Sequence, residues 1–346
     1  MQGSSVKTVY SLLDCDRVPT LVGVEAKERL SRLIQVLEST SWPVFLTGHS
    51  GSGKTSMAMN LAKEYSARQK VPAYYVQLSP EMTKTSLILG LRLVDGSLMP
   101  VDGVVAECMQ TGGVLVVDEA AHTTHEMLLM FNSVLDRTSV TSVGDRIVYS
   151  APTFRVIFCA NDSSYAGNVR LPQSFAQRLV VFHFDYPSFQ PECEITRRII
   201  DDECATPLAL PDSVIRYIVG VLREVRSDQF PVSARNSAIV AVLLNLAMGD
   251  SPSEESRSLD PYFTDEDTAE AKRRLIASRV LQRDPAHLRL EDLILPEITE
   301  FEAFVSQVGL DVFRESFLSG FMYYLDLDGL ELNQSTVRNA LANRII

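Results

Sequence analysis

Short apolar runs alternate with amphipathic helical patterns through the first half of the chain. Two of the helical patterns cover residues 54–68 and 125–135, where apolar side chains recur at helical spacing. The apolar runs are rich in valine, isoleucine, phenylalanine or tyrosine, and they cover residues 43–47, 73–78, 114–117, 155–159 and 180–184. Strands that alternate with helices are typical of a parallel sheet with crossover helices. We therefore expect an α/β fold with five parallel strands.

Two irregular stretches interrupt this pattern, and a helical half follows it. Residues 136–149 hold two β-like runs around Gly144 and predict a hairpin just before the fourth strand. Residues 91–103 hold two Asp-Gly pairs and predict a second hairpin or a loop. The later residues predict helices at 192–202, 212–226, 234–248, 268–283, 300–304 and 311–324. A polar, acidic loop or linker is expected over 249–267.

The composition is that of a globular chain. Of the 346 residues, 46% are hydrophobic and 22% are charged, which excludes a mainly disordered chain, a coiled coil and a fibre. The longest apolar run, 238–244, is too short to span a bilayer, and the first residues lack the pattern of a signal peptide. The five cysteines show no paired spacing. We expect reduced thiols, no membrane association and a cytoplasmic location.

Charge narrows the range of partners. The net charge of −12 argues against a broad electrostatic grip on nucleic acid, which needs a basic surface. Residues 251–346 hold 18 acidic and 10 basic residues, so −8 of that charge lies in the last part of the chain. The remaining part is close to neutral, and a local basic pore there stays possible.

A phosphate-binding motif lies between the first apolar run and the helix at 54–68. The pattern G-x-x-x-x-G-K-[ST] is matched by Gly48, His49, Ser50, Gly51, Ser52, Gly53, Lys54 and Thr55, and Ser56 follows it. Its glycines let backbone N–H groups cradle phosphate oxygens at a helix N-terminus. Lys54 is expected to reach the β- and γ-phosphates, and Thr55 to ligate Mg²⁺. The motif therefore predicts a site for ATP with Mg²⁺.

Two adjacent carboxylates follow the third apolar run, about 60 residues after this motif. Successive side chains of a strand point to opposite faces, so Asp118 and Glu119 can have different roles. We expect Asp118 to hold Mg²⁺ through water and Glu119 to polarise the attacking water. His122 and His125 lie nearby, but no third ligand for a metal is legible beside them. His49 is interpreted as an ordinary loop residue.

Three further polar residues are candidates for contact with ATP. Asn161 ends the fourth apolar run, where its amide can position water or touch the γ-phosphate; the alternative is a turn asparagine. Arg178 is either a surface charge or an arginine finger that reaches the γ-phosphate of a neighbouring subunit. Arg235 opens a predicted helix, where the helix dipole disfavours a cation unless an anion such as phosphate accompanies it.

These motifs, in this order, resemble those of the AAA+ ATPases, and within them the MoxR branch. The sequence is most similar to the CbbQ/NorQ group, with GvpN and the cobaltochelatase subunit CobS as more distant relatives. The most diagnostic stretch is 177–187, Gln-Arg-Leu-Val-Val-Phe-His-Phe-Asp-Tyr-Pro, which is similar to the QRF…FDYP stretch of CbbQ-type proteins. The resemblance covers about residues 18–248.

The resemblance implies a fold, an assembly and a set of roles. The fold is an AAA+ P-loop NTPase core over 1–187, a parallel five-stranded sheet with flanking helices and hairpin insertions. An α-helical lid over 188–250 and an acidic helical C-terminal extension over 251–346 would follow. The assembly is a ring, usually a hexamer, with ATP between subunits. Asn161 matches the first sensor, Arg178 the trans-acting finger, Arg235 the second sensor, and Val22 and Gly23 the region near the adenine.

The sequence also departs from the family pattern. Ala176 occupies a position where the family often has a second arginine, and Asp162 replaces the common proline after Asn161. Members of the branch typically act with a von Willebrand A-domain partner, and their insertions face the pore of the ring. We therefore expect a ring-forming ATPase that remodels or activates a protein client. The alternatives are a motor or loader that acts on DNA, the ATPase subunit of a metal chelatase, and an assembly protein with slow turnover.

Overall fold

A computed structural model of the chain describes residues 11–94, 97–136, 139–143, 146–161, 171–204, 208, 210–227, 231–249, 266–327 and 345. The chain divides into two compact units, Met1–Tyr186 and Pro187–Ile346, the N-terminal and C-terminal units. In the described part of the chain, no helix is long and apolar enough to cross a membrane. All five cysteines are free thiols.

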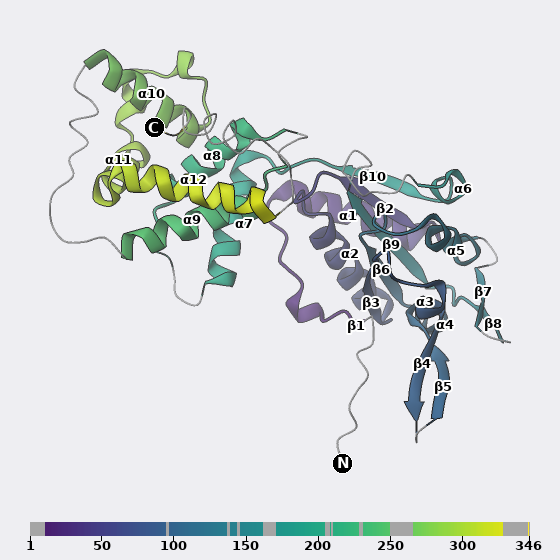
Figure 1. The fold of residues 1–346 in the computed structure, drawn as a ribbon. Helices are drawn as coiled ribbons and strands as arrows, with labels where there is room; N and C mark the ends of the chain where they lie inside the picture. The colour runs from purple at the N-terminus through teal and green to yellow at the C-terminus, as the bar shows by residue number, and fades with distance from the viewer. Residues whose placement is uncertain are drawn as a thin grey trace. The chain divides into compact units, whose positions relative to one another are not determined.

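A six-stranded sheet forms the centre of the N-terminal unit (Figure 1). Its order is β1-β3-β6-β9-β2-β10, and all neighbours are parallel except β1 (Ser11–Leu12), which pairs antiparallel with β3. The parallel strands are β3 (Ala73–Gln77), β6 (Val114–Asp118), β9 (Arg155–Asn161), β2 (Val44–Gly48) and β10 (Val180–Phe184). The five expected parallel strands are therefore confirmed, and β1 is an addition at the edge.

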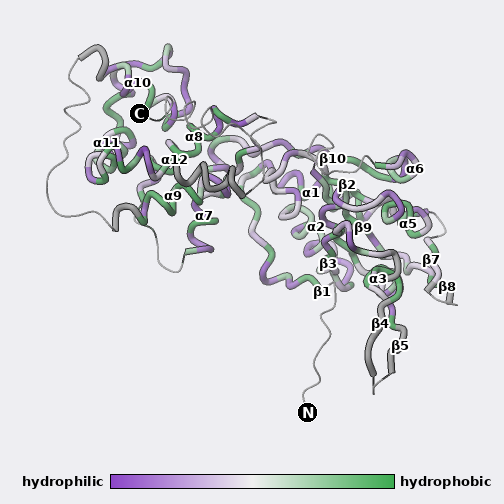
Figure 2. The backbone as a smooth tube through the Cα atoms, viewed as in Figure 1, coloured by the Kyte–Doolittle hydropathy of each residue, from purple (hydrophilic) through white to green (hydrophobic). Residues whose placement is uncertain are grey.

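Helices cover both faces of the sheet (Figure 1). On one face α1 (Val24–Ser39) and α2 (Lys54–Gln69) pack against alternate strand residues such as Val114 and Val116. On the other face α4 (Val104–Thr111) and α5 (His125–Leu135) pack against Leu115 and Val117. The short helices η1 (Cys15–Arg17), α3 (Lys84–Ile88) and α6 (Gln173–Ala176) complete the unit. The apolar residues of the buried strands are green in Figure 2.

Two antiparallel hairpins extend from this unit. β4 (Leu89–Val94) pairs with β5 (Ser97–Asp102), and β7 (Val140–Val143) pairs with β8 (Arg146–Tyr149). The hairpin predicted within 136–149 is confirmed, and the stretch predicted as a hairpin or a loop is a hairpin. The predicted turn positions 95, 96, 144 and 145 lie outside the described residues.

The C-terminal unit is helical. Its helices are α7 (Phe189–Glu203), α8 (Asp212–Val225), α9 (Ala234–Gly249), α10 (Glu266–Leu281), η3 (Pro285–His287), η4 (Leu290–Ile294), α11 (Pro296–Val308) and α12 (Leu310–Leu327). Each predicted helix of this half corresponds to an observed one, with bounds that differ by up to four residues. Most of the predicted linker lies outside the described residues.

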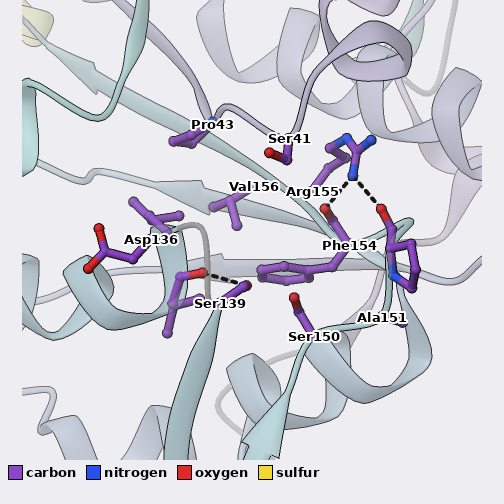
Figure 3. A pocket seen from close by; sticks show the side chains of 12 residues that line it. Ser41, Pro43, Asp136, Ser139, Ser150, Ala151, Phe154, Arg155 and Val156 are labelled. Atoms are coloured by element: carbon purple, nitrogen blue, oxygen red, sulfur yellow. Dashed lines mark hydrogen bonds between the residues drawn. The ribbon is translucent and has the colours of Figure 1, made fainter.

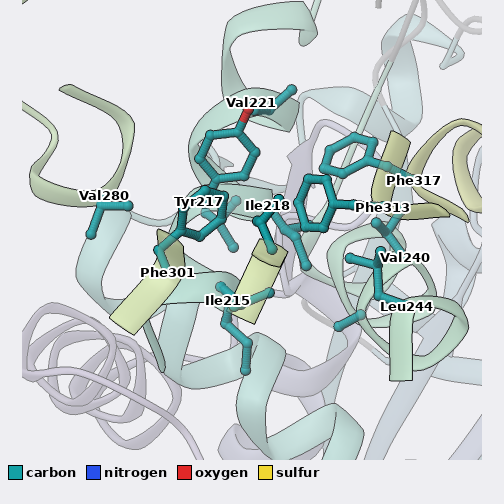
Figure 4. Packing of buried hydrophobic residues seen from close by; sticks show 14 of the residues in the cluster. Ile215, Tyr217, Ile218, Val221, Val240, Leu244, Val280, Phe301, Phe313 and Phe317 are labelled. Atoms are coloured by element: carbon teal, nitrogen blue, oxygen red, sulfur yellow. The ribbon is translucent and has the colours of Figure 1, made fainter. Parts of the chain in front are cut away.

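One hydrophobic core joins helices on both sides of residue 250. Tyr217 of α8 packs on Phe301 of α11 with ring centroids 4.4 Å apart, and Phe301 meets Phe313 of α12 edge-on at 5.8 Å (Figure 4). Val240 and Leu244 of α9 belong to the same core. The helices expected to form a lid and an extension therefore share one interior. The division into three domains stays a prediction.

Candidate nucleotide-binding site

The phosphate-binding motif forms the loop between β2 and α2. Gly48, Gly51 and Gly53 have positive φ angles of 143°, 74° and 90°, a region that favours glycine. Gly48 also lies against the neighbouring strand, because a Cβ there would be 2.1 Å from the carbonyl oxygen of Phe184. The loop can thus take this path only with glycine at position 48.

Lys54 is buried beneath the loop, with 6% of its surface exposed. Its Nζ donates hydrogen bonds to the carbonyl oxygens of Gly48, at 3.0 Å, and His49, at 2.6 Å. These bonds hold the ammonium group of Lys54 against the backbone of the phosphate loop. A cation at a helix N-terminus within a loop of backbone N–H groups suits a phosphate group.

Ser52 gives an independent test of whether a phosphate fits this loop. Ser52 is 6% exposed, and its backbone N–H donates to the carbonyl oxygen of His49 at 3.2 Å. Its Oγ is buried and has no hydrogen-bond partner among the described residues. A buried hydroxyl without a partner costs about 1–3 kcal/mol. A phosphate oxygen in the loop would accept this hydrogen bond, so the loop fits a nucleotide.

Asp118 and Thr55 meet at the carboxyl end of the sheet. Residues 114, 116 and 118 of β6 face α1 and α2, so the alternation along the strand directs Asp118 toward the first turn of α2. Thr55 Oγ1 donates to Asp118 Oδ2 at 3.0 Å, and the side chain of Asp118 is buried. A hydroxyl and a carboxylate are oxygen ligands of the kind that Mg²⁺ prefers. The residues present therefore fit Mg²⁺.

Tyr75 is a site residue that the sequence analysis missed. Its hydroxyl donates to Asp118 Oδ2 at 3.0 Å from the adjacent strand β3, and Gln77 pairs with Asp118 in register. Burial, followed by the charge of Asp118, holds the pKa of the Tyr75 hydroxyl well above its usual range. Tyr75 is thus a permanent hydrogen-bond donor to this carboxylate. Only the strand order reveals the contact, and the sequence carries no separate signal for it.

Glu119 follows Asp118 in a conformation that is uncommon for glutamate. Its φ is +52°, and its N–H donates to Asp118 Oδ1 at 2.9 Å. Burial and the charge of Asp118 raise the pKa of the Glu119 carboxyl, while His122 and Lys54 act in the opposite direction. A carboxylate with a raised pKa is a better acceptor for a proton or a water hydrogen at neutral pH.

Asn161 is brought to the same edge of the sheet. It ends β9, which lies between β6 and β2, and it pairs in register with Gly48. The order of the strands therefore places Asn161 between Asp118 and the start of the loop. Within one sheet edge, the structure thus brings together the loop, the carboxylates and the predicted sensor.

The predicted adenine region lies along α2. Val22 is buried, and Gly23, with φ of 86°, precedes α1. The segment before it is held by Asn60 Nδ2, which donates to the carbonyl oxygen of Pro19 at 2.7 Å and to that of Ser56 at 2.8 Å. Ser56 lies in the first turn of α2, next to Thr55, so this segment is tied to the helix that begins at the phosphate loop.

Arg178 lies at the opposite end of the strands from the phosphate loop. β10 is parallel to β2, with Val180 opposite Val44 at the start and Phe184 opposite Gly48 at the end. Arg178 precedes the strand, so about 16 Å of strand separates it from its own phosphate loop. Its guanidinium pairs with Asp136, Nε to Oδ1, at 2.7 Å. The structure therefore does not bring Arg178 to the nucleotide site of its own subunit.

A cavity of about 250 Å³ opens near this end of the strands (Figure 3). It is lined by residues at the starts of β2 and β9, including Pro43 and Arg155, and by Asp136 at the end of α5. Arg155 is held at its rim by hydrogen bonds to the carbonyl oxygens of Pro152 and Phe154. The cavity is thus separate from the phosphate loop.

Arg235 belongs to the C-terminal unit. It is the second residue of α9, and its side chain is exposed. Asn236 caps this start, because its Oδ1 accepts from Ser233 N at 2.8 Å and from Ser233 Oγ at 2.9 Å. The expected position of Arg235 at a helix N-terminus is confirmed, and its contact with a nucleotide stays a prediction.

Comparison with known proteins identifies the domain. Residues 43–179 match the AAA domain of the dynein-related subfamily. Midasin of Dictyostelium discoideum is 27% identical over 238 residues, which cover 65% of this chain and only 4% of midasin. The gas vesicle ATPase GvpN1 of Halobacterium salinarum is 25% identical, over 64% of this chain and 67% of its own. Protein CbbQ of Hydrogenophilus thermoluteolus is 23% identical, over 50% of this chain and 64% of its own.

Among solved structures, NtrX of Brucella abortus has a TM-score of 0.50 and 18% identity, over 95% of this chain and 70% of that one, which shows a likeness of fold alone. The expected similarity to GvpN and CbbQ, both of the MoxR branch, is confirmed by the sequence matches. The chain is therefore an AAA+ ATPase that carries an AAA domain of the dynein-related subfamily.

Proposed function

We propose that this ATPase forms a ring, a hexamer, that couples hydrolysis of Mg²⁺-ATP to the remodelling or activation of a protein client. The observation that carries the proposal is the position of Arg178, a full strand length from its own phosphate loop. An arginine finger placed there can serve only the nucleotide of a neighbour. A site divided between two surfaces of one subunit suits the head-to-tail contacts that close rings.

Each site residue has a role in this proposal. Gly48, Gly51 and Gly53 shape the loop, while His49, Ser50, Ser52 and Ser56 contribute its remaining surface to the phosphates. Lys54 leaves the carbonyl groups of the loop for the β- and γ-phosphates, and Val22 and Gly23 line the adenine. Mg²⁺, when bound, neutralises phosphate charge; Thr55 would hold it directly and Asp118 through water. Glu119 polarises the attacking water, Asn161 positions it, and Arg235 contacts the phosphates.

Arg178 has a resting partner in this scheme. The ion pair with Asp136 is partly exposed, with 30% of the arginine side chain accessible, so it is easily exchanged for a phosphate. A guanidinium binds phosphate oxygens in a planar, bidentate geometry and stabilises the charge of the transition state. Arrival of a neighbour's γ-phosphate would thus release Asp136 and complete the site.

Protein clients are favoured over nucleic acid by two observations. Ile147 and Tyr149 of β8 expose 63% and 66% of their surfaces, which gives this strand of the hairpin exposed apolar side chains suited to a polypeptide. The net charge of −12 opposes a general grip on DNA. Five free thiols are in keeping with the cytoplasm. A von Willebrand A-domain partner is proposed from the similarity to the CbbQ and GvpN proteins.

A complementation experiment tests whether Arg178 acts on the nucleotide of a neighbouring subunit. Lys54→Ala subunits, which keep Arg178, are mixed with Arg178→Ala subunits, which keep the loop. Each protein alone is expected to be inactive. In a one-to-one mixture about a quarter of the interfaces combine an intact loop with an intact arginine, so turnover should recover to about a quarter of the wild-type value.

The control is a mixture of Arg178→Ala with the double variant that lacks both groups, which should stay inactive. No recovery in the first mixture would show that Lys54 and Arg178 must belong to the same subunit, and the proposal of a ring would fall. Stimulation of hydrolysis by DNA at physiological salt would instead favour a motor or loader on nucleic acid.

A further inference from the structure

Two histidines and an aspartate gather beside the phosphate loop. One ligand atom each from His49, His183 and Asp185 lies within 4.8 Å of the others. It is the one such group of three metal-ligating side chains found among the described residues. None of the roles argued above uses His183 or Asp185.

The strand register builds this group. β2 and β10 are parallel, with His183 opposite Thr47 and Phe184 opposite Gly48. His49 and Asp185 are the next residues of the two chains, so they leave the sheet side by side. The close approach of Gly48 to the Phe184 carbonyl, where no Cβ would fit, brings the two backbones together at this point.

The imidazole of His49 is oriented by its neighbours. It stacks on the ring of Tyr186 at 5.2 Å with an interplanar angle of 6°, and it meets His183 nearly at right angles at 6.2 Å. His183 Nε2 is 3.3 Å from Asp185 Oδ1. Ligand atoms around a tetrahedral zinc ion are about 3.4 Å apart. One edge of such a site is therefore already formed, and the remaining ligand atoms lie within 4.8 Å of one another.

From this geometry we infer that His49, His183 and Asp185 bind a divalent transition metal of the zinc class, which clips the phosphate loop to the end of β10. Two imidazoles and one carboxylate suit zinc, cobalt or nickel, whereas Mg²⁺ and Ca²⁺ prefer oxygen ligands. Water completes the coordination. The side chains of His183 and Asp185 are 49% and 79% exposed, so the ion can enter from solvent.

The clip has a consequence for the nucleotide. The carbonyl oxygen of His49 accepts a short hydrogen bond of 2.6 Å from Lys54 Nζ. A metal on the His49 ring would fix the residue that holds Lys54 away from the phosphates, so it would stabilise the present arrangement of the loop. Bound metal therefore disfavours ATP, and ATP disfavours the metal by the same factor.

Metal binding is tested on the full chain without nucleotide, by calorimetric titration with Zn²⁺ in the presence of excess Mg²⁺. Wild type should bind one equivalent at this site. His183→Gln and Asp185→Asn should each lower the affinity at least tenfold. The matched control is His287→Gln, because His287 also faces an aspartate, Asp284, at 3.6 Å in an exposed pair, yet it belongs to no group of three ligands among the described residues.

The clip is tested by ATP turnover at buffered free Zn²⁺. Zinc should raise the ATP concentration needed for half-maximal turnover in wild type and in His287→Gln, and much less in His183→Gln. Zinc also binds ATP itself, and the comparison at equal free zinc removes that effect. Equal zinc affinity in wild type, His183→Gln and Asp185→Asn would overturn the site. Weakened binding with equal inhibition of all three proteins would overturn the clip.

Discussion

Glu192 of α7 is the clearest place to test how the C-terminal unit holds its shape. Glu192 is 0% exposed, and both of its carboxylate oxygens accept hydrogen bonds from arginines. Arg223 Nη1 donates to Oε2 at 2.5 Å, Arg226 Nη1 donates to Oε2 at 3.2 Å, and Arg226 Nη2 donates to Oε1. Glu192→Gln keeps the volume and removes the charge, so that two arginines lose their anionic partner.

The magnitude follows from the burial of the partners. Removing one member of a buried ion pair costs about 3–5 kcal/mol. The arginine side chains are 29% and 11% exposed, so water partly solvates the remaining cations and the cost should lie near 3 kcal/mol. For a domain of 150–250 residues, 1 kcal/mol lowers Tm by about 2–4 °C. The transition of the C-terminal unit should therefore fall by about 6–12 °C.

The loss should also reach the start of α9. Arg226 Nε donates to the carbonyl oxygen of Val232 at 2.6 Å, and Thr196 Oγ1 donates to that of Glu192 at 2.8 Å and to that of Ala234 at 3.4 Å. The same network therefore fixes the turn that presents Arg235. From the proposed contact of Arg235 with the phosphates, a weaker affinity for ATP is expected even where the variant is fully folded.

The assay is differential scanning calorimetry of the full chain, followed by ATP binding at 20 °C. The control is Glu194→Gln, on the same helix two residues later, where the side chain is exposed and accepts a long hydrogen bond of 3.5 Å from Gln190. Its Tm should change by no more than a surface substitution does, about 0.5 kcal/mol in free energy. If Glu192→Gln shifts Tm as little as Glu194→Gln, the reasoning about the buried network is refuted.

Three further predictions concern the N-terminal unit. Gly48→Ala should abolish equilibrium ATP binding, because its Cβ would meet the Phe184 carbonyl oxygen at 2.1 Å; retained affinity would contradict the tight approach of the strands. Tyr75→Phe should raise the Mg²⁺ concentration for half-maximal turnover about tenfold, since a hydrogen bond to a charged group contributes about 1.5–3 kcal/mol. The folded-state pKa of Glu119 is raised, so its contribution to stability is present below the unfolded pKa and is lost as pH rises through the folded one. Glu119→Gln should therefore match or exceed the wild-type urea midpoint at pH 8 while losing hydrolysis. The difference in midpoint, variant minus wild type, should be larger at pH 8 than at pH 4. A smaller difference at pH 8 would refute a raised pKa of Glu119.

The parallel strands and the phosphate loop could be predicted because their signals are local. A strand buried on both faces, such as 114–117, reads as a continuous apolar run, and the loop motif combines glycines with a lysine at fixed spacing. Helix α1 is missing from the sequence-based prediction, although Leu30, Leu33, Ile34 and Leu37 recur at helical spacing. It fully buries only Leu33, Ile34 and Leu37, while Leu30 and Val36 are partly buried.

The missed contacts depend on the order of strands, which no local pattern encodes. Tyr75 reaches Asp118 only because β3 lies next to β6, and His183 reaches His49 only because β10 lies next to β2. The pairing of Arg178 with Asp136 joins residues 42 positions apart. Sequence analysis can name such residues one at a time, but the strand order is needed to say which of them meet.

The shared interior of the C-terminal unit has a consequence for how the chain is made. α8 packs against α7, α9, α10 and α11, and α12 covers α9. On the ribosome, α8 is complete at Val225, yet α11 and α12 begin only at Pro296 and Leu310. At about 5–20 residues per second, several seconds pass before Phe301 and Phe313 can cover Tyr217. During that interval the apolar face of α8 is a natural ligand for a chaperone that guards nascent chains.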